Sequence, residues 1–160
     1  MCGASSWDDQ VNDQFNFDDS LVAWGVSLSS NLRFGRDVVR MQYVFGDGVE
    51  NYMNDAPVDV AAEPNFQDPT RPVKGKALPM RSLVAFLDHS WTNKWTTSVG
   101  YSQLAIDNTV LQRRDAFHRG QYAIANVLFT PAEQVVYGAE LQWARRTNFG
   151  DGFVTRPSLR

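Results

Sequence analysis

The sequence has 160 residues, 15 basic and 18 acidic side chains, 43% hydrophobic residues and 12% aromatic residues. This composition is typical of a folded single domain, here residues 1–160, and excludes disordered, collagen-like and disulfide-stapled proteins. The single cysteine, Cys2, excludes an internal disulfide and a multi-cysteine metal cluster. The net charge of -3 disfavours nucleic acid as a partner, and no apolar run reaches the roughly 18 residues of a membrane helix.

The first clear element covers residues 21–34 and alternates with a period of two. Its even positions are mostly large and apolar, and its odd positions are small or polar, from Ala23 to Arg33. A strand that faces lipid needs about 9–11 residues of this pattern. The segment is therefore predicted to be a membrane-crossing β-strand.

The same pattern continues along the chain. The predicted strands are 21–34, 38–46, 79–91, 95–107, 117–130 and 134–146, with another beginning near Phe153 and an earlier one ending near Trp7. The alternation does not assign faces within 83–87 and 122–129.

The connections between these strands alternate in length. Short turns are expected at 35–37, 92–94 and 131–133, and longer polar connections at 47–78, 108–116 and 147–152. Aromatic residues lie beside the short turns, namely Phe34, Trp91, Trp95, Phe129 and Tyr137. This order indicates an all-β, antiparallel up-and-down transmembrane barrel with aromatic residues at the membrane interface.

The number of strands bears on whether the chain can close by itself. Bacterial barrels have an even number of strands, at least eight, and an open sheet edge in lipid costs several kcal/mol per unsatisfied group. No signal peptide precedes the first strand, and the last strand stops at Arg160. We expect a fragment of a larger barrel, the alternative being a minimal eight-stranded barrel with ragged ends.

Three stretches resemble a known family. They are FGDGVENYMNDAPVD at 45–59, GQYAIANVLFTP at 120–131 and GAELQWARRTNFGDGF at 138–153. Together they resemble the C-terminal half of the DcaP-like trimeric outer-membrane transporters, which are porins of Gram-negative bacteria. The resemblance implies a sixteen-stranded barrel, a homotrimer in the outer membrane, and passage of small, preferentially anionic solutes such as dicarboxylates.

A diffusion channel requires a charged, shaped lumen, and arginine suits anions because it stays charged and can hold a carboxylate with two hydrogen bonds. The candidate pore-lining and anion-binding residues are Arg40, Arg146, Arg33, Gln42, Glu140, Gln142, Arg119 and Arg81. Arg40 and Arg146 are the main candidates, since the facing of Arg119 and Arg81 is ambiguous. The alternative places Arg33 and Arg145 at the interface, against lipid headgroups or lipopolysaccharide phosphates.

The long connection 47–78 is acidic in its first part and basic in its last part, which includes Arg71, Lys74 and Lys76. Two interpretations remain open: a constriction loop folded into the pore, or an exposed outer loop. Acidic loops can bind Ca²⁺, but no EF-hand spacing is present, and we predict neither a metal nor a cofactor.

Catalytic motifs are lacking, and we expect no enzyme. The run Asp88-His89-Ser90 suggests a catalytic triad, but neighbours on a strand point to opposite faces. Besides the porin, two hypotheses remain: a non-conducting barrel or soluble β-sandwich that binds a partner through its loops, and an outer-membrane hydrolase.

Overall fold

The computed structural model describes residues 2–7, 19–49, 58–68, 71–150 and 153–159. These residues contain ten strands: β1(Cys2–Trp7), β2(Asp19–Phe34), β3(Asp37–Asp47), β4(Val60–Pro64), β5(Val73–Ala77), β6(Pro79–Ser90), β7(Trp95–Ile106), β8(Phe117–Ala132), β9(Val135–Asn148) and β10(Phe153–Leu159). No helix in the described part of the chain is long and apolar enough to cross a membrane.

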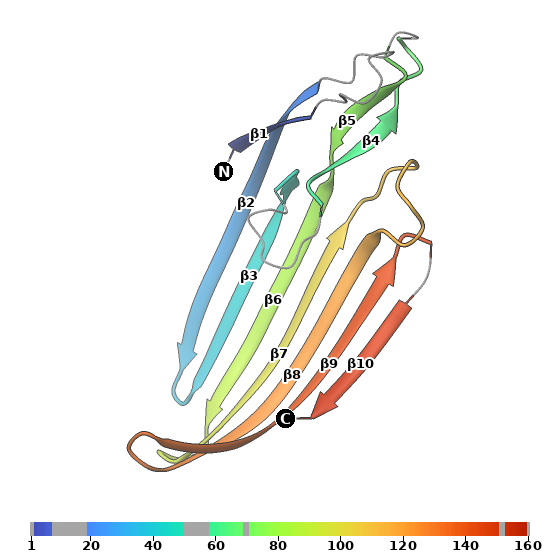
Figure 1. The fold of residues 1–160 in the computed structure, drawn as a ribbon. Helices are drawn as coiled ribbons and strands as arrows, with labels where there is room; N and C mark the ends of the chain where they lie inside the picture. Colours follow the sequence, from blue (N-terminus) through green and yellow to red (C-terminus); the bar gives the residue numbers. More distant parts are fainter. Residues whose placement is uncertain (1, 8–18, 50–57, 69–70, 151–152, 160) are drawn as a thin grey trace.

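Eight strands form one antiparallel sheet in the order β1-β2-β3-β6-β7-β8-β9-β10, and β4 pairs with β5 in a separate hairpin. The large sheet is curved and open, with β1 and β10 at its two edges (Figure 1). The predicted all-β meander and its six central strands are confirmed, and an open sheet fits part of a larger barrel.

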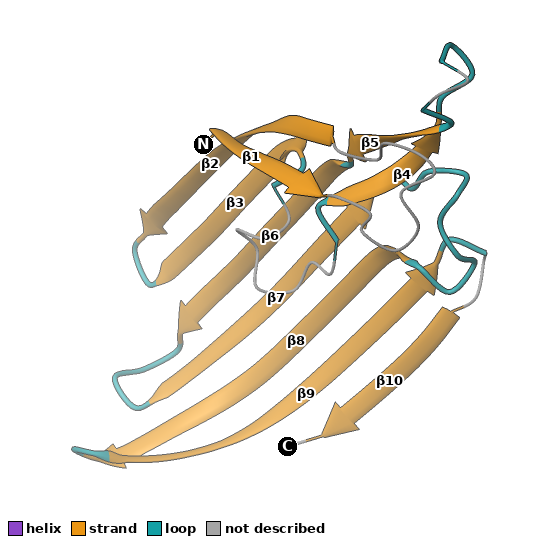
Figure 2. Cartoon of the chain, turned by 45° about the horizontal axis from the view of Figure 1, so that its top comes forward, coloured by secondary structure: helices purple, strands orange, loops and turns teal. Residues whose placement is uncertain are grey.

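Short turns lie at one end of the sheet, called here the short-turn end, and longer connections lie at the other, the long-loop end (Figure 2). The β2–β3 turn needs only two residues, and Gly35 has a φ of 62°, which a residue without Cβ adopts freely. The β8–β9 turn falls at residues 133–134, slightly later than expected, with Gln134 at a φ of 66°.

The register divides the sheet into two faces, because residues paired across antiparallel strands project to the same side. The apolar face carries Val26, Leu28 and their partners, and the polar face carries Ser27, Ser29 and theirs. Following the pairing across the sheet assigns the faces of Pro79–Ser90 in β6 and of Arg119–Phe129 in β8, including the stretches that the sequence pattern left open.

The apolar face is uncovered. Leu28 is 60% exposed, Leu141 is 56% exposed and Val99 is 51% exposed, although they lie in the middle of three different strands. A soluble β-sandwich would bury such side chains in its core. The structure therefore fits a sheet that faces lipid better than it fits the sandwich.

A small hydrophobic cluster lies on the opposite, polar face near the long-loop end. Leu78, Met80 and Ile106 are almost completely buried there. The cluster consists of Ala23, Val44, Val49, Ala61, Leu78, Met80, Leu104 and Ile106. Five of its members come from the polar-face positions of four neighbouring strands, and the other three come from the segment between β3 and β6.

Candidate pore-lining surface

The polar face presents rows of side chains that run across the strands. One row, near the short-turn end, contains Arg33, Val38, Asp88, Ser98, Asn126 and Glu140. The next row contains Asn31, Arg40, Phe86, Gly100, Ile124 and Gln142. Basic groups thus lie on β2 and β3 and acidic groups on β6 and β9, so the two rows carry a charge difference across the sheet.

Arg40 forms an ion pair on this face. Its Nη1 atom lies 2.8 Å from Oδ2 of Asp88, and the two side chains are 59% and 24% exposed. The pair compensates part of the positive charge of Arg40. Arg33, in the row of Asp88, has no hydrogen-bond or ion-pair partner within the described ranges.

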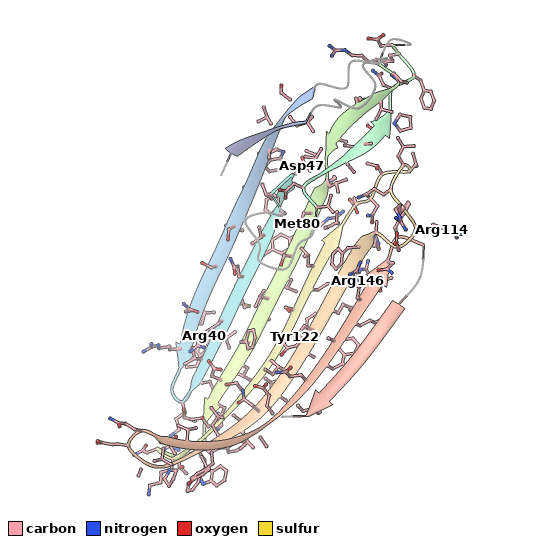
Figure 3. The ribbon with its side chains drawn as sticks, viewed as in Figure 1. Arg40, Asp47, Met80, Arg114, Tyr122 and Arg146 are labelled. Atoms are coloured by element: carbon pink, nitrogen blue, oxygen red, sulfur yellow. The ribbon has the colours of Figure 1, made fainter. Side chains whose placement is uncertain are left out.

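Arg146 lies far from Arg40, near the long-loop end of β9 (Figure 3). Its Nε atom donates to Asn148 Oδ1 at 2.9 Å, its Nη2 atom donates to the carbonyl of Asp115 at 3.3 Å, and its guanidinium lies 5.6 Å from the centre of the Phe117 ring. All three partners are neutral. They hold the guanidinium in place without compensating its charge.

The uncharged candidates are held by their neighbours. Gln42 donates to Ser27 Oγ at 3.1 Å, and Gln142 donates to Glu140 Oε1. The register therefore places Arg33, Arg40, Gln42, Glu140, Gln142 and Arg146 together on the polar face, in agreement with the sequence parity. Their role in transport stays a prediction.

Two candidates lie on the other face. Arg81 pairs with Phe45 and Ala105, and Arg119 pairs with Ala105 and Thr147, all of which are apolar-face positions. The expectation that Arg81 and Arg119 share a surface with Arg40 is therefore wrong. Their strands carry hydrophobic residues at both parities near these positions, so the alternation alone could not assign them.

The two arginines of the interfacial alternative lie on opposite faces of the sheet. Arg33 lies on the polar face, whereas Arg145 pairs with Gln121 on the apolar face. His89 is likewise on the apolar face, 2.5 Å from Asp37 Oδ1 and 4.4 Å from the Trp91 ring, while Asp88 and Ser90 project to the other side. The apparent triad is thus split between the two faces.

Aromatic side chains gather on the apolar face at the short-turn end. The rings of Trp95 and Phe129 stack with centroids 4.5 Å apart, and Tyr137 is the register partner of Phe129. Trp91 Nε1 donates to Thr97 Oγ1 at 2.9 Å. This arrangement matches the aromatic belt expected at a membrane interface.

The described parts of segment 47–78 pack against the polar face. Gly48, with a φ of 66°, turns the chain so that a Cβ there would lie 3.2 Å from the Cβ atoms of Ala23 and Ala77. Val49 then covers Gly25, so that a Cβ added at Gly25 would lie 3.0 Å from Val49 Cγ2. The side chain of Val49 is therefore on the same side of the sheet as Arg40 and Arg146, which favours the inward-folded interpretation for this part of the segment.

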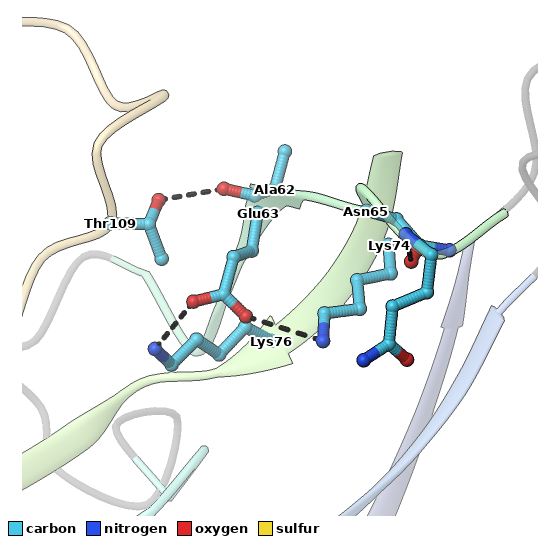
Figure 4. Close-up of polar contacts among 7 residues, drawn as sticks. Ala62, Glu63, Asn65, Lys74, Lys76 and Thr109 are labelled. Atoms are coloured by element: carbon cyan, nitrogen blue, oxygen red, sulfur yellow. Dashed lines mark hydrogen bonds and ion pairs between the residues drawn. The ribbon is translucent and has the colours of Figure 1, made fainter. Parts of the chain in front are cut away.

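The rest of the described segment forms the β4–β5 hairpin, where the sequence predicts only a long polar connection. Lys76 Nζ lies 2.8 Å from Glu63 Oε1, and Lys74 Nζ lies 3.7 Å from Glu63 Oε2 (Figure 4). The hydrogen bond from Lys76 lowers the pKa of the Glu63 carboxyl below its usual value, and the charges of both lysines act in the same direction. The hairpin carries two cations around one anion.

The hairpin is fixed to the rest of the long-loop end. Ala61 belongs to the polar-face cluster, and Thr109 Oγ1 donates to the carbonyl of Ala62 at 2.7 Å. Lys76, the register partner of Ala61, projects to the same side of the hairpin as Ala61. Glu63 and Lys74 also line an open pocket that reaches Val110 of the β7–β8 connection. Within the described ranges, no group of three or more potential ligand side chains could hold a metal ion.

No protein-family model matches the chain, and no curated protein sequence matches it. Among solved structures, the chain is similar to the outer membrane channel DcaP of Acinetobacter baumannii, with 13% sequence identity and a TM-score of 0.73. This chain has the fold of a DcaP-type porin. The match covers 99% of the chain and 43% of the channel, so the chain spans less than half of the channel's length. The predicted barrel-fragment fold is confirmed.

Proposed function

We propose that the chain forms part of the wall of an outer-membrane porin through which small anions diffuse. The observation that carries this proposal is the division of one sheet into an uncovered apolar face and a polar face with arginines. A barrel wall needs lipid on one side and water on the other, and this sheet meets both requirements. The likeness to a channel of the same fold adds support.

The preference for anions rests on the cations of the polar face. Arg33 and Arg146 face no carboxylate partner among the described residues. The two positive charges of Lys74 and Lys76 outnumber the one negative charge of Glu63. Fixed cations along a pore attract anions and exclude cations. A series of separated cations suits a dicarboxylate, the solute class that the family resemblance implies, and a homotrimer in the outer membrane completes the proposal.

The test is ion selectivity of the complete barrel, of which this chain would form part, in planar bilayers. Removing cations from the wall of the pore lowers its attraction for anions, so Arg40→Ala combined with Arg146→Ala should lower the permeability of chloride relative to potassium, measured as a shift in reversal potential. Arg81→Ala combined with Arg119→Ala is the matched control, because it removes the same charge from the other face.

The control pair should leave the reversal potential unchanged. Equal shifts in both double variants would contradict the assignment of the pore wall. Absence of conductance in the folded, membrane-inserted protein would instead favour a non-conducting barrel.

A further inference from the structure

An open groove lies between the β4–β5 hairpin and the β7–β8 connection at the long-loop end. Its volume is about 470 Å³, which is enough for a small organic molecule. Its lining includes Glu63, Asn65, Phe66, Gln67 and Lys74 from the hairpin segment and Val110 from the connection. The groove therefore brings together two segments that are far apart in the sequence.

The groove has an apolar wall on each side. Phe66 is 94% exposed and Val110 is 75% exposed, and they are the two most exposed large hydrophobic side chains in the part of the chain that the structure describes. Removing apolar surface of this kind from water is favourable. The apolar end of a ligand that lies between Phe66 and Val110 would cover both.

One cation of the groove is only loosely paired. Lys76 Nζ lies 2.8 Å from Oε1 of Glu63, whereas Lys74 Nζ lies 3.7 Å from Oε2, beyond ordinary hydrogen-bond distance (Figure 4). The three side chains together carry one net positive charge. Lys74 is the member of the pair of lysines that lines the groove, so its half-exposed ammonium presents this charge to a ligand.

Both sides of the groove are held in place by hydrogen bonds. Thr109, which precedes Val110, is buried and donates from Oγ1 to the carbonyl of Ala62 at 2.7 Å. Within the hairpin, the backbone amide of Asn65 donates to the carbonyl of Pro72 at 2.9 Å. The groove is therefore formed before a ligand binds, which lowers the entropy lost on binding.

We infer that this groove binds a small organic carboxylate with one apolar end. The carboxylate accepts a hydrogen bond from Lys74 Nζ, and the apolar end lies between Phe66 and Val110. Lys74 projects to the same side of the hairpin as Ala61, which packs into the polar-face cluster, so the site is on the polar-face side of the hairpin. This inference goes beyond the proposed passage of anions and rests on the groove, not on conductance.

The test is fluorine NMR of the complete barrel in lipid nanodiscs, with empty nanodiscs as the reference for partition into lipid. The probe para-fluorobenzoate has both features of the ligand, para-fluorobenzyl alcohol lacks the charge, and fluoroacetate lacks the ring. We expect para-fluorobenzoate to bind saturably and at least about fivefold more tightly than either of the other two probes. Equally tight binding of the alcohol or of fluoroacetate would overturn the inference.

Exposed positions in the groove allow variants that should keep the fold. Lys74→Gln should weaken the binding of para-fluorobenzoate about fivefold, because it removes one nearby charge. Phe66→Ser should weaken it by a similar factor of about five, because it removes an apolar wall. Glu63→Gln should instead tighten it about twofold or more, because the carboxylate that competes for Lys74 is lost.

Two matched controls lie outside the groove and should bind as the unaltered protein does. They are Lys94→Gln, in the β6–β7 turn, and Leu111→Ser, next to Val110. Unchanged binding in both Lys74→Gln and Phe66→Ser would overturn the inference. Conductance recorded in parallel distinguishes the two proposals, because conductance without binding contradicts only the groove site and binding without conductance contradicts only the channel.

Discussion

The carboxylate of Asp88 lies 2.8 Å from the guanidinium of Arg40, joining β6 to β3 on the polar face of the sheet. The ion pair compensates a cation that, in the proposed pore, would otherwise act on anions. Asp88 is 24% exposed and Arg40 is 59% exposed, so both side chains are accessible on the polar face.

Asp88→Asn is expected to increase anion selectivity. Removing the carboxylate leaves Arg40 uncompensated, and the permeability ratio of chloride to potassium should rise by a factor of up to about five, as expected for one nearby charge in a largely aqueous setting. Reversal potentials in a salt gradient measure this ratio. Asp37→Asn, on the apolar face at a similar height, is the control, and an equal change there would argue against the assigned faces.

Gly100→Ala is expected to destabilise the sheet. A Cβ at this position would lie 2.2 Å from Cε1 of the Phe86 ring, so the ring must leave its place over the glycine. Overpacking of this kind lowers the free energy of unfolding by about 1–3 kcal/mol. Unfolding by heat or urea in detergent, followed on a gel that separates folded from unfolded protein, can detect this loss. Phe86→Leu in the same chain should restore most of the loss, and no effect of Gly100→Ala would contradict the described packing.

Val49→Asp is expected to detach the start of segment 47–78 from the polar face. Val49 is buried against Gly25, and an unpaired carboxylate there would be strongly disfavoured. If this segment narrows the pore, single-channel conductance should increase. Val58→Asp, at an exposed position of the same segment, is the control. A conductance equal to that of the unaltered protein would show that the segment does not limit passage.

Because of the ion pairs of Glu63, we expect the stability of the β4–β5 hairpin and the anion selectivity of the pore to depend on pH. The lowered pKa means that the pairs stabilise the hairpin fully above the ordinary value of 4.5 and lose this contribution as the pH falls through the lower, folded-state value. Protonated Glu63 also leaves Lys74 and Lys76 uncompensated, so anion selectivity should rise in acid. Reversal potentials between neutral pH and acid, compared with Glu63→Gln, isolate this contribution; identical pH profiles of the two proteins would refute it.

The strands were predictable because apolar and polar residues alternate along any strand with one apolar face, most clearly in β2 and β9. The β4–β5 hairpin was not predicted, because Val60–Pro64 and Val73–Ala77 are too short to establish a period and contain proline, glycine and lysine. The faces of β6 depend on its pairing with β3, since Leu83, Val84, Phe86 and Leu87 give both faces apolar side chains.

The site was predictable only in part. Sequence parity placed Arg40, Gln42, Gln142 and Arg146 on one face, as the register does. The contact between Arg40 and Asp88 joins residues far apart in the chain and follows from the β3–β6 register, which no local pattern encodes. The positions of Lys74 and Lys76 could not be predicted, because they depend on the hairpin that brings both lysines to Glu63.

Cysteine labelling along β2 tests most directly whether the polar face of the sheet meets water and the apolar face meets lipid. In a Cys2→Ser background, single cysteines replace Val26, Ser27, Leu28 and Ser29 in the membrane-inserted protein. A charged, membrane-impermeant thiol reagent should label the two serine positions and spare the valine and leucine positions between them. Equal labelling of all four positions, or preferential labelling of Val26 and Leu28, would contradict the account.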